Sequence, residues 1–290
     1  MKNSLINKIK TEKLLVSDGA WGTFLQDEGL QSGECPELWN ETHPNVVRNI
    51  AESYIDAGAD MVETNTFGGS KHKLEMFALG EKTYDLNFLG ARLSRESAGE
   101  SSYVLGSIGP SGAILMMGEV NEGELYEGFL EQAKGLADGG ADALCVETFS
   151  DLQEAELAVC AAKTTGLPVI CTFTFENGFT MMGVTPEQYA AKMIGLDVDV
   201  LGTNCGNGLD GMIDIVCRIR KAAPEKPILV HANAGLPQTA NGQIVYPETP
   251  KSMGRMVSDI VTAGANIVGG CCGTTPEHIR RIRQEIDKLK

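Results

Sequence analysis

One type of segment occurs three times along the chain and constrains its fold more than any other feature. The copies are "DAGADMVET" from Asp56, "DGGADALCVET" from Asp138 and "TAGANIVGGCC" from Thr262. In each copy, a glycine suited to a helix end precedes a short turn and an apolar run. The glycines at 58, 140 and 264 lie 82 and 124 residues apart, which corresponds to two and three units of about 41 residues. The repeat therefore predicts a succession of strand and helix units.

Eight apolar runs at this spacing are the expected strands. Runs such as "PVICTF" and "PILVHA" are apolar at successive positions, which is typical of parallel strands covered on both faces. We expect a single α/β domain spanning residues 1–290, a (β/α)8 TIM-type barrel, with an open doubly wound sheet as the alternative. The predicted strands are residues 14–18, 60–65, 102–107, 142–147, 168–174, 199–204, 227–232 and 266–270.

Helix signals lie between these runs. Residues 45–57 carry apolar side chains at helical spacing, and a capping-box pattern from Ser150 to Gln153 opens a helix over residues 151–165. A Thr-Pro pair, in which threonine caps a helix and proline takes its first position, predicts three further helix starts. These pairs lie at residues 185–186, 249–250 and 275–276.

The charge of the chain disfavours two classes of partner. Its 24 basic and 39 acidic residues give a formal net charge of −15, which repels phosphate backbones and anionic lipids. The N-terminal segment lacks the apolar stretch of a signal peptide, and no apolar run approaches the about 18 residues of a membrane span. We therefore expect a cytoplasmic protein that binds neither nucleic acid nor membranes.

The eight cysteines are too few for a disulfide scaffold in a chain of 290 residues. Four of them lie in predicted strands or helices, where we expect free thiols that pack as small apolar side chains. These four are Cys145, Cys160, Cys171 and Cys217.

Three other cysteines follow the ends of predicted strands. Cys205 follows the sixth strand, and Cys271 and Cys272 follow the eighth. Active sites of such barrels lie at the C-terminal ends of the strands, so these thiols should meet on one rim. Three thiolates favour zinc, and three protein ligands leave a fourth position open for substrate. Glycines at 269, 270 and 273 would let the backbone turn both adjacent cysteines toward one ion.

Other interpretations of these residues remain open. Cys271 and Cys272 could form a redox-active pair, with Cys205 an unrelated buried thiol. His231 lies in an apolar strand, where a histidine is usually packed and hydrogen-bonded, whereas the amide oxygen of Asn233 could fill the fourth metal position. The predicted strand ends carry no lysine, which argues against a Schiff-base aldolase.

Five segments together resemble a known family. They are "DGAWGTFLQ" (18–26), "ETNTFGG" (63–69), "GTNCGNG" (202–208), "HANAGLP" (231–237) and "GGCCGTTPEHI" (269–279). The set is similar to the motifs of the homocysteine S-methyltransferases and extends over nearly the whole chain. The wording "DGAWGT" is nearest to the homocysteine-binding domain of cobalamin-dependent methionine synthase.

The resemblance implies roles for particular residues. Cys205, Cys271 and Cys272 would be the zinc ligands and the catalytic group. The substrate ammonium would meet Asp18 and Glu147, and the backbone N–H groups around Phe67 and Gly68 would bind its carboxylate. Asn204 and Asn233 complete the expected substrate-binding set, while Glu63 could equally brace the turn after the second strand.

The implied reaction is zinc-dependent transfer of a methyl group from methylcobalamin or another methylcorrinoid to homocysteine, which gives methionine. The folate, cobalamin and activation modules of methionine synthase do not fit into 290 residues. The donor is therefore expected on a separate corrinoid protein. The alternatives are S-methylmethionine or S-adenosylmethionine as the donor, or a non-catalytic zinc barrel that docks a corrinoid carrier.

Overall fold

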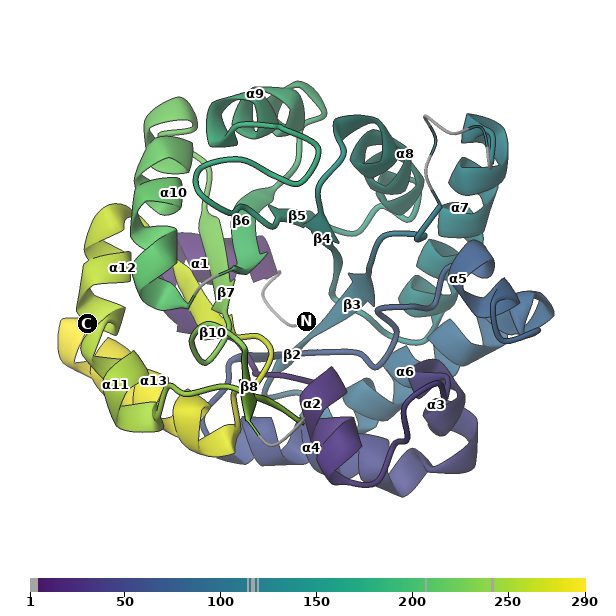
Figure 1. The fold of residues 1–290 in the computed structure, drawn as a ribbon, viewed down its shortest axis with the longest axis horizontal. Helices are drawn as coiled ribbons and strands as arrows, with labels where there is room; N and C mark the ends of the chain where they lie inside the picture. Colours follow the sequence, from purple (N-terminus) through teal and green to yellow (C-terminus); the bar gives the residue numbers. More distant parts are fainter. Residues whose placement is uncertain (1–4, 114, 116–117, 119, 207, 241–242) are drawn as a thin grey trace.

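Eight parallel strands form a nearly closed barrel surrounded by helices (Figure 1). This computed structural model describes residues 5–290 except 114, 116–117, 119, 207 and 241–242. The sheet order β1-β10-β7-β6-β5-β4-β3-β2 follows the chain around the barrel, which confirms the predicted (β/α)8 fold over the open sheet. The strands are β1 Leu15–Val16, β2 Met61–Glu63, β3 Tyr103–Ile108, β4 Ala143–Phe149, β5 Val169–Phe173, β6 Val200–Cys205, β7 Ile228–Ala232 and β10 Ile267–Gly270. Each matches one predicted run.

Side-chain carboxylates join the first strand to the second. The N–H of Val16 donates to Asp60 Oδ2 over 2.9 Å, and the N–H of Asp60 donates to the Val16 carbonyl over 2.7 Å. Beyond the end of β1, Asp18 Oδ2 accepts hydrogen bonds of 2.8 Å from the N–H of Glu63 and from Trp21 Nε1. Asp18 is fully buried, and these bonds hold β1 beside β2 where the barrel closes.

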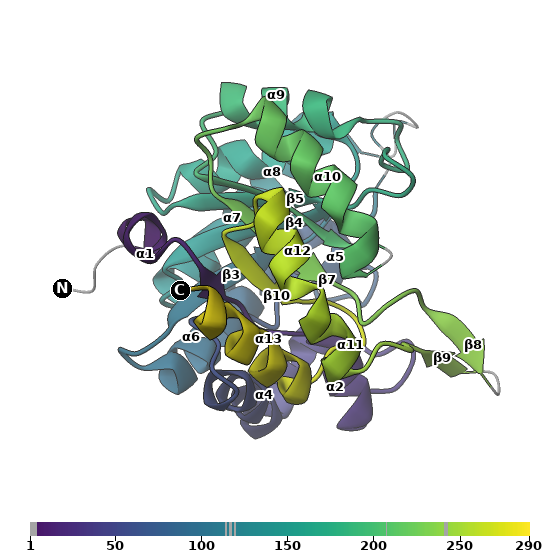
Figure 2. The ribbon, with the colours of Figure 1, turned by 90° about the vertical axis from the view of Figure 1, so that its left-hand side faces the viewer.

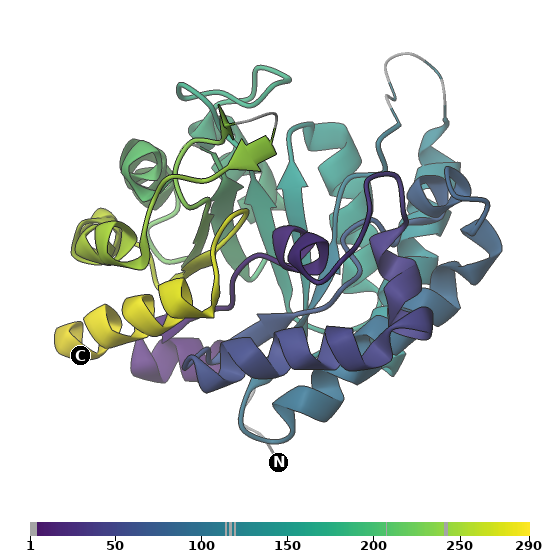
Figure 3. The same cartoon turned by 60° about the horizontal axis from the view of Figure 1, so that its bottom comes forward.

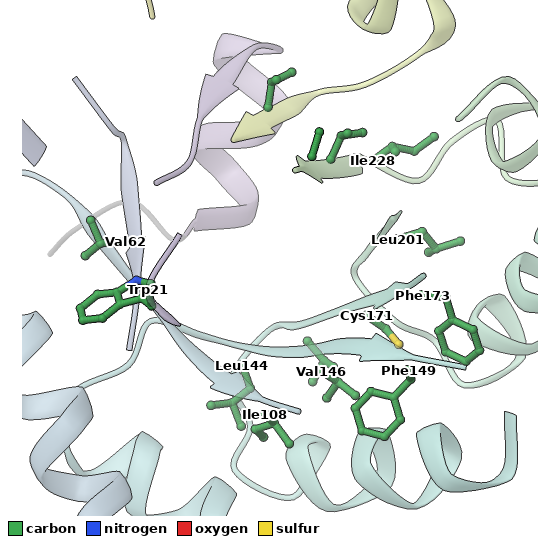
Figure 4. Packing of buried hydrophobic residues seen from close by; sticks show 14 of the residues in the cluster. Trp21, Val62, Ile108, Leu144, Val146, Phe149, Cys171, Phe173, Leu201 and Ile228 are labelled. Atoms are coloured by element: carbon green, nitrogen blue, oxygen red, sulfur yellow. The ribbon is translucent and has the colours of Figure 1, made fainter. Parts of the chain in front are cut away.

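The core has two layers, one inside the barrel and one between the strands and the outer helices. The inner layer takes side chains such as Leu15, Met61 and Ile170 from successive strands. Helix α1, Leu5–Glu12, adds Leu5 and Ile9 to this layer and so covers the N-terminal end of the barrel. The outer layer is larger, and Figure 4 shows part of it around Leu144, Val146, Phe149 and Phe173.

Helices follow the strands as the repeat predicts. Thr185, Thr249 and Thr275 cap their helices, as expected from the Thr-Pro pairs. The cap of α8 is Asp151 rather than Ser150, because the Asp151 carboxylate accepts from the N–H groups of the first turn. The helices are α2 Gly22–Asp27, α3 Trp39–Thr42, α4 Pro44–Asp56, α5 Lys71–Glu75, α6 Thr83–Ala98, α7 Glu122–Asp138, α8 Leu152–Lys163, α9 Pro186–Gly195, α10 Leu209–Ala222, α11 Pro250–Arg255, α12 Val257–Ala263 and α13 Pro276–Leu289, with 3-10 turns η1 Pro36–Leu38 and η2 Gly80–Lys82.

A two-stranded hairpin that the sequence did not predict projects from the barrel (Figure 2). It consists of β8, Gln238–Ala240, and β9, Gln243–Val245, and it follows β7. In Figure 3 the hairpin lies at the end of the barrel toward which the strands point.

None of the helices in the described part of the chain is long and apolar enough to cross a membrane.

The four cysteines expected to be buried divide into two pairs. Cys145 in β4 and Cys171 in β5 are buried, as predicted, whereas Cys160 and Cys217 are exposed. The prediction was wrong for the second pair because α8 and α10 turn these positions away from the barrel toward solvent.

Replacement of Asp18 tests the barrel closure. In Asp18→Ala, the N–H of Glu63 and Trp21 Nε1 lose their shared acceptor in a buried place, so we expect the free energy of unfolding to fall by about 3 kcal/mol. Asp18→Asn keeps an oxygen for both donors and should lose less than about half as much. Urea unfolding followed by circular dichroism measures both variants. Equal stability of Asp18→Ala and the wild type would contradict the role assigned to this carboxylate.

Candidate active site

Three cysteine sulfurs meet at the C-terminal end of the barrel. Cys205 ends β6, and Cys271 and Cys272 directly follow β10, with β7 lying between the two strands. The three Sγ atoms lie within 4.8 Å of one another, and those of Cys205 and Cys271 are 3.1 Å apart. Three sulfur atoms this close can serve as ligands of one soft metal ion.

The local backbone explains how the thiols converge. Cys205 adopts a left-handed conformation with φ 60°, which is uncommon for a residue with a side chain. After β10, the N–H of Thr274 and its hydroxyl both bond to the Cys271 carbonyl, so the chain turns sharply rather than remaining extended. The turn lets Cys271 and Cys272 point to the same place, although neighbouring side chains of a strand point to opposite faces.

The neighbouring thiols Cys271 and Cys272 differ in pKa. Hydrogen bonds from the Cys205 and Cys271 thiols lower the pKa of Cys272 to about 3. Hydrogen bonds to Cys205 and Cys272 raise the pKa of Cys271. One thiolate is thus held by two neighbouring thiols, a group that a cation can enter by displacing the remaining protons.

A cavity of about 280 Å³ opens beside the thiols. The three cysteines line it together with Phe67 and Glu147. Among the residues that the structure describes, four others from the predicted site lie close by but do not line this cavity. They are Asp18, Gly68, Asn204 and Asn233.

Two glutamates and a histidine form a second buried group at the cavity wall. Ligand atoms of Glu63, Glu147 and His231 lie within 4.8 Å of one another, and Glu63 Oε1 is 3.5 Å from His231 Nδ1. Ser107 Oγ donates a hydrogen bond to Glu147, whereas Glu63 Oε1 and His231 Nε2 have no hydrogen-bond partner in the described part of the chain. This donor set can also hold a cation, either a metal ion or an ammonium group.

Burial and charge repulsion set the protonation of this group. Burial, together with the charge of Asp18, raises the pKa of Glu147 to about 7. Burial and the charge of Glu147 raise the pKa of Glu63 well above its usual range. Burial lowers the pKa of His231 to about 4, so its imidazole is neutral near pH 7. Without a cation, the two glutamates thus retain protons at least in part near pH 7, and a bound cation would favour their charged forms.

The predicted asparagines make hydrogen bonds within the protein. Asn204 Oδ1 accepts from the N–H of Thr148 over 3.0 Å and from Thr172 Oγ1 over 2.7 Å, and Asn204 Nδ2 donates to Thr148 Oγ1. These bonds hold Thr148 in a left-handed conformation with φ 65°. Asn233 Nδ2 donates to the Gly206 carbonyl over 2.9 Å, while Oδ1 of Asn233 is buried without a hydrogen-bond partner among the described residues.

The loop after β2 contributes Phe67 to the cavity wall, and Gly68 follows it in the chain. The Phe67 ring is 43% exposed, and its carbonyl accepts from the N–H of Gly109 over 2.9 Å. The N–H of Gly68 donates to Oε1 of Glu37 over 2.6 Å. Glu37 lines the cavity but lies in the η1 turn rather than at a strand end, so the pattern of polar residues at strand ends does not predict it.

Comparisons with known proteins identify the family of this chain. Residues 15–286 match the family model described as homocysteine S-methyltransferase. Methionine synthase of Mycobacterium leprae is 35% identical over 291 residues, covering 93% of this chain and 24% of that protein. Methionine synthase of Mycobacterium tuberculosis is 33% identical over 302 residues, covering 97% of this chain and 25% of that protein. The chain thus spans about a quarter of the length of these relatives.

Solved structures share the fold. The metallated form of the homocysteine methyltransferase MmuM from Escherichia coli superposes with a TM-score of 0.80 at 22% identity, covering 97% of this chain and 99% of that one. Its oxidised form gives the same TM-score at 21% identity and with the same coverage. The family model and the curated relatives carry the assignment: this chain belongs to the homocysteine S-methyltransferase family of enzymes.

Proposed function

We propose that this chain transfers a methyl group from a methylcorrinoid to the sulfur of homocysteine, with a zinc ion held by Cys205, Cys271 and Cys272. The convergence of three sulfur atoms within 4.8 Å at the wall of a cavity carries the proposal. The residues suit zinc because the ligands are soft sulfurs, one already held as a thiolate, and the adjoining cavity leaves room for a fourth ligand.

When bound, zinc would supply a reactive sulfur at neutral pH by lowering the pKa of the homocysteine thiol, whose reference value is about 8.5. The deprotonated sulfur donates an electron pair to the methyl carbon, and the donor leaves with the electrons of the broken bond. The thiol proton goes to solvent before transfer. This step needs no protein base, and the chain's own part is to bind and orient the amino acid.

The cavity wall supports a definite orientation of homocysteine. Glu63 and Glu147 line the cavity and lack a cationic partner in the described residues, so they suit the substrate ammonium. Asp18 is committed to the barrel closure through Glu63 and Trp21. The backbone of Phe67 and Gly68 then faces the carboxylate end of the substrate.

The size of the cavity bears on the donor. At about 280 Å³, it lies just below the range of about 300–1,000 Å³ usual for pockets that enclose drug-sized ligands. It suits one small amino acid better than an amino acid together with a nucleoside, so the methyl group must arrive from the mouth of the barrel.

Exposed apolar side chains at the mouth favour a donor carried by a protein. Large apolar residues exposed to solvent lie on the loops that follow β2, β5 and β7, and gathered apolar exposure is typical of protein contact sites. They are Phe67, Phe179, Met181, Met182, Leu236, Ile244 and Val245. The curated relatives are named methionine synthase, which supports methionine as the product.

The proposal predicts zinc-dependent formation of methionine. The zinc-loaded protein is incubated with homocysteine and free methylcobalamin, and methionine is measured. Cys272→Ala should lower the rate by more than about 100-fold, because it removes a metal ligand, and chelation should do the same. Cys160→Ala, which changes an exposed cysteine on α8, is the matched control.

Other outcomes of this assay separate the alternatives. Full activity of Cys272→Ala without zinc would refute the proposal. If methionine forms only from S-methylmethionine or S-adenosylmethionine, that compound is the methyl donor in place of the methylcorrinoid. Homocysteine that fails to bind the zinc-loaded protein would favour a non-catalytic zinc barrel.

The assignment of the ammonium site gives a second prediction. Glu147→Gln keeps a hydrogen-bonding partner for Ser107 but removes a charge, so the KM for homocysteine should rise about 10-fold or more. The inhibition constant of 4-mercaptobutyrate, which has the thiol and carboxylate of homocysteine but no ammonium, should not rise. Steady-state kinetics measures both values. If both compounds bind more weakly by the same factor, Glu147 maintains the shape of the cavity rather than binding the ammonium group.

A further inference from the structure

The carboxylate of Glu37 accepts a hydrogen bond from a backbone N–H group beside the cavity. Its side chain is 3% exposed and lines the cavity. Oε1 of Glu37 accepts from the N–H of Gly68 over 2.6 Å, and Oε2 accepts from the Cys35 thiol over 3.3 Å. The carboxylate of Glu37 thus lines the cavity and binds the N–H of Gly68, a residue that does not itself line it.

This position is unfavourable for a charged carboxylate. Burial raises the pKa of Glu37, and among the described residues its carboxylate accepts hydrogen bonds from an amide and a thiol rather than from a cation. Glu63 and Glu147 line the same cavity and add negative charge. An isolated buried carboxylate normally costs stability, so the contact with Gly68 calls for an explanation.

We propose that Glu37 is an internal occupant of the carboxylate subsite and sets the affinity for amino-acid substrates. The inference rests on the proposed function, in which the backbone of Phe67 and Gly68 receives the substrate carboxylate. In the ligand-free site, Oε1 of Glu37 satisfies the Gly68 N–H. The incoming carboxylate takes over this donor, and Glu37 turns away.

Lys73 offers the displaced carboxylate a new partner. A methyl group built on Gly68 would lie 2.9 Å from Oε1 of Glu37 and 3.3 Å from Cγ of Lys73, so the two side chains flank the same glycine. Lys73 belongs to α5, and its charge partly opposes the rise in the pKa of Glu37. Rotation of the Glu37 side chain toward Lys73 would exchange an amide partner for an ammonium partner.

The exchange would make recognition depend on the carboxylate of the ligand. A thiol with a carboxylate must displace Glu37, and part of its binding free energy is used for that displacement. A thiol without a carboxylate leaves Glu37 in place and meets no such cost. Removing the charge of Glu37 should therefore strengthen the binding of thiols that carry a carboxylate and leave the binding of other thiols unchanged.

The test compares two thiols on the zinc-loaded protein by titration calorimetry. Homocysteine has the carboxylate, and 3-mercaptopropylamine is the same molecule without it. In Glu37→Gln, the neutral oxygen is a weaker acceptor, so the Kd of homocysteine should fall about 10-fold while that of 3-mercaptopropylamine changes less than about twofold. Glu34→Gln, at an exposed position three residues earlier, is the matched control.

Two results would overturn the inference. Weaker homocysteine binding in Glu37→Gln would show that Glu37 holds the loop in its binding geometry, and an equal change for both thiols would show a general effect on the cavity. Thermal unfolding of each variant checks that the fold is kept. Because calorimetry does not depend on turnover, homocysteine binding without methionine from any donor would refute the proposed function alone.

A double mutant separates the role of Lys73. Lys73→Met removes the new partner of Glu37, so the Kd of homocysteine should rise about fivefold or more. In the Glu37→Gln background, residue 37 has no negative charge for Lys73 to pair with, so adding Lys73→Met should cause little of this rise. An equal rise in both backgrounds would mean that Lys73 attracts the substrate directly and that Glu37 does not turn toward it.

Discussion

Closure of the barrel is the constraint on which the active site depends. Cys205 and Cys271 are 66 residues apart in sequence, and their sulfurs meet because β6, β7 and β10 are consecutive neighbours around the sheet. Glu63 and Glu147 belong to β2 and β4, which lie across the barrel from β6 and β10 in strand order. The hydrogen bonds of Asp18 hold β1 against β2 and so keep the glutamates and the thiols on one rim.

Buried carboxyl groups that lack a cationic partner in the described part of the chain are the cost of this site. Glu63, Glu147 and Asp18 are all buried, and the pKa of Asp18 is raised to about 6 by burial. Such a group destabilises an empty fold and stabilises a complex with cations. A metal ion at the thiols and an ammonium at the glutamates would each relieve part of the repulsion. These buried carboxyl groups support the proposed orientation, in which the ammonium end of the substrate enters the acidic side.

The sequence predicted the scaffold and the three thiols because those signals are local. Apolar runs, Thr-Pro caps and cysteines at strand ends depend on neighbours in the chain, and the structure contains them where expected. The partners of a carboxylate are not local. Asp18 was assigned to the substrate, yet its oxygens bond to Trp21 and to Glu63, a residue 45 positions away. Glu37 was missed for the same reason, since its contact with Gly68 spans 31 residues.

Backbone strain near the thiols shows how the site is held in a geometry that no single segment favours. Thr148 and Cys205 both have positive φ, a conformation that costs free energy for residues with a side chain. Asn204 links them, because it precedes Cys205 in β6 and binds both the backbone and the hydroxyl of Thr148. For Asn204 to bind substrate directly, these bonds would have to break and release the strain at Thr148. The buried amide of Asn204 therefore supports the backbone around Cys205, and the geometry of the three thiols depends in part on a residue that does not line the cavity.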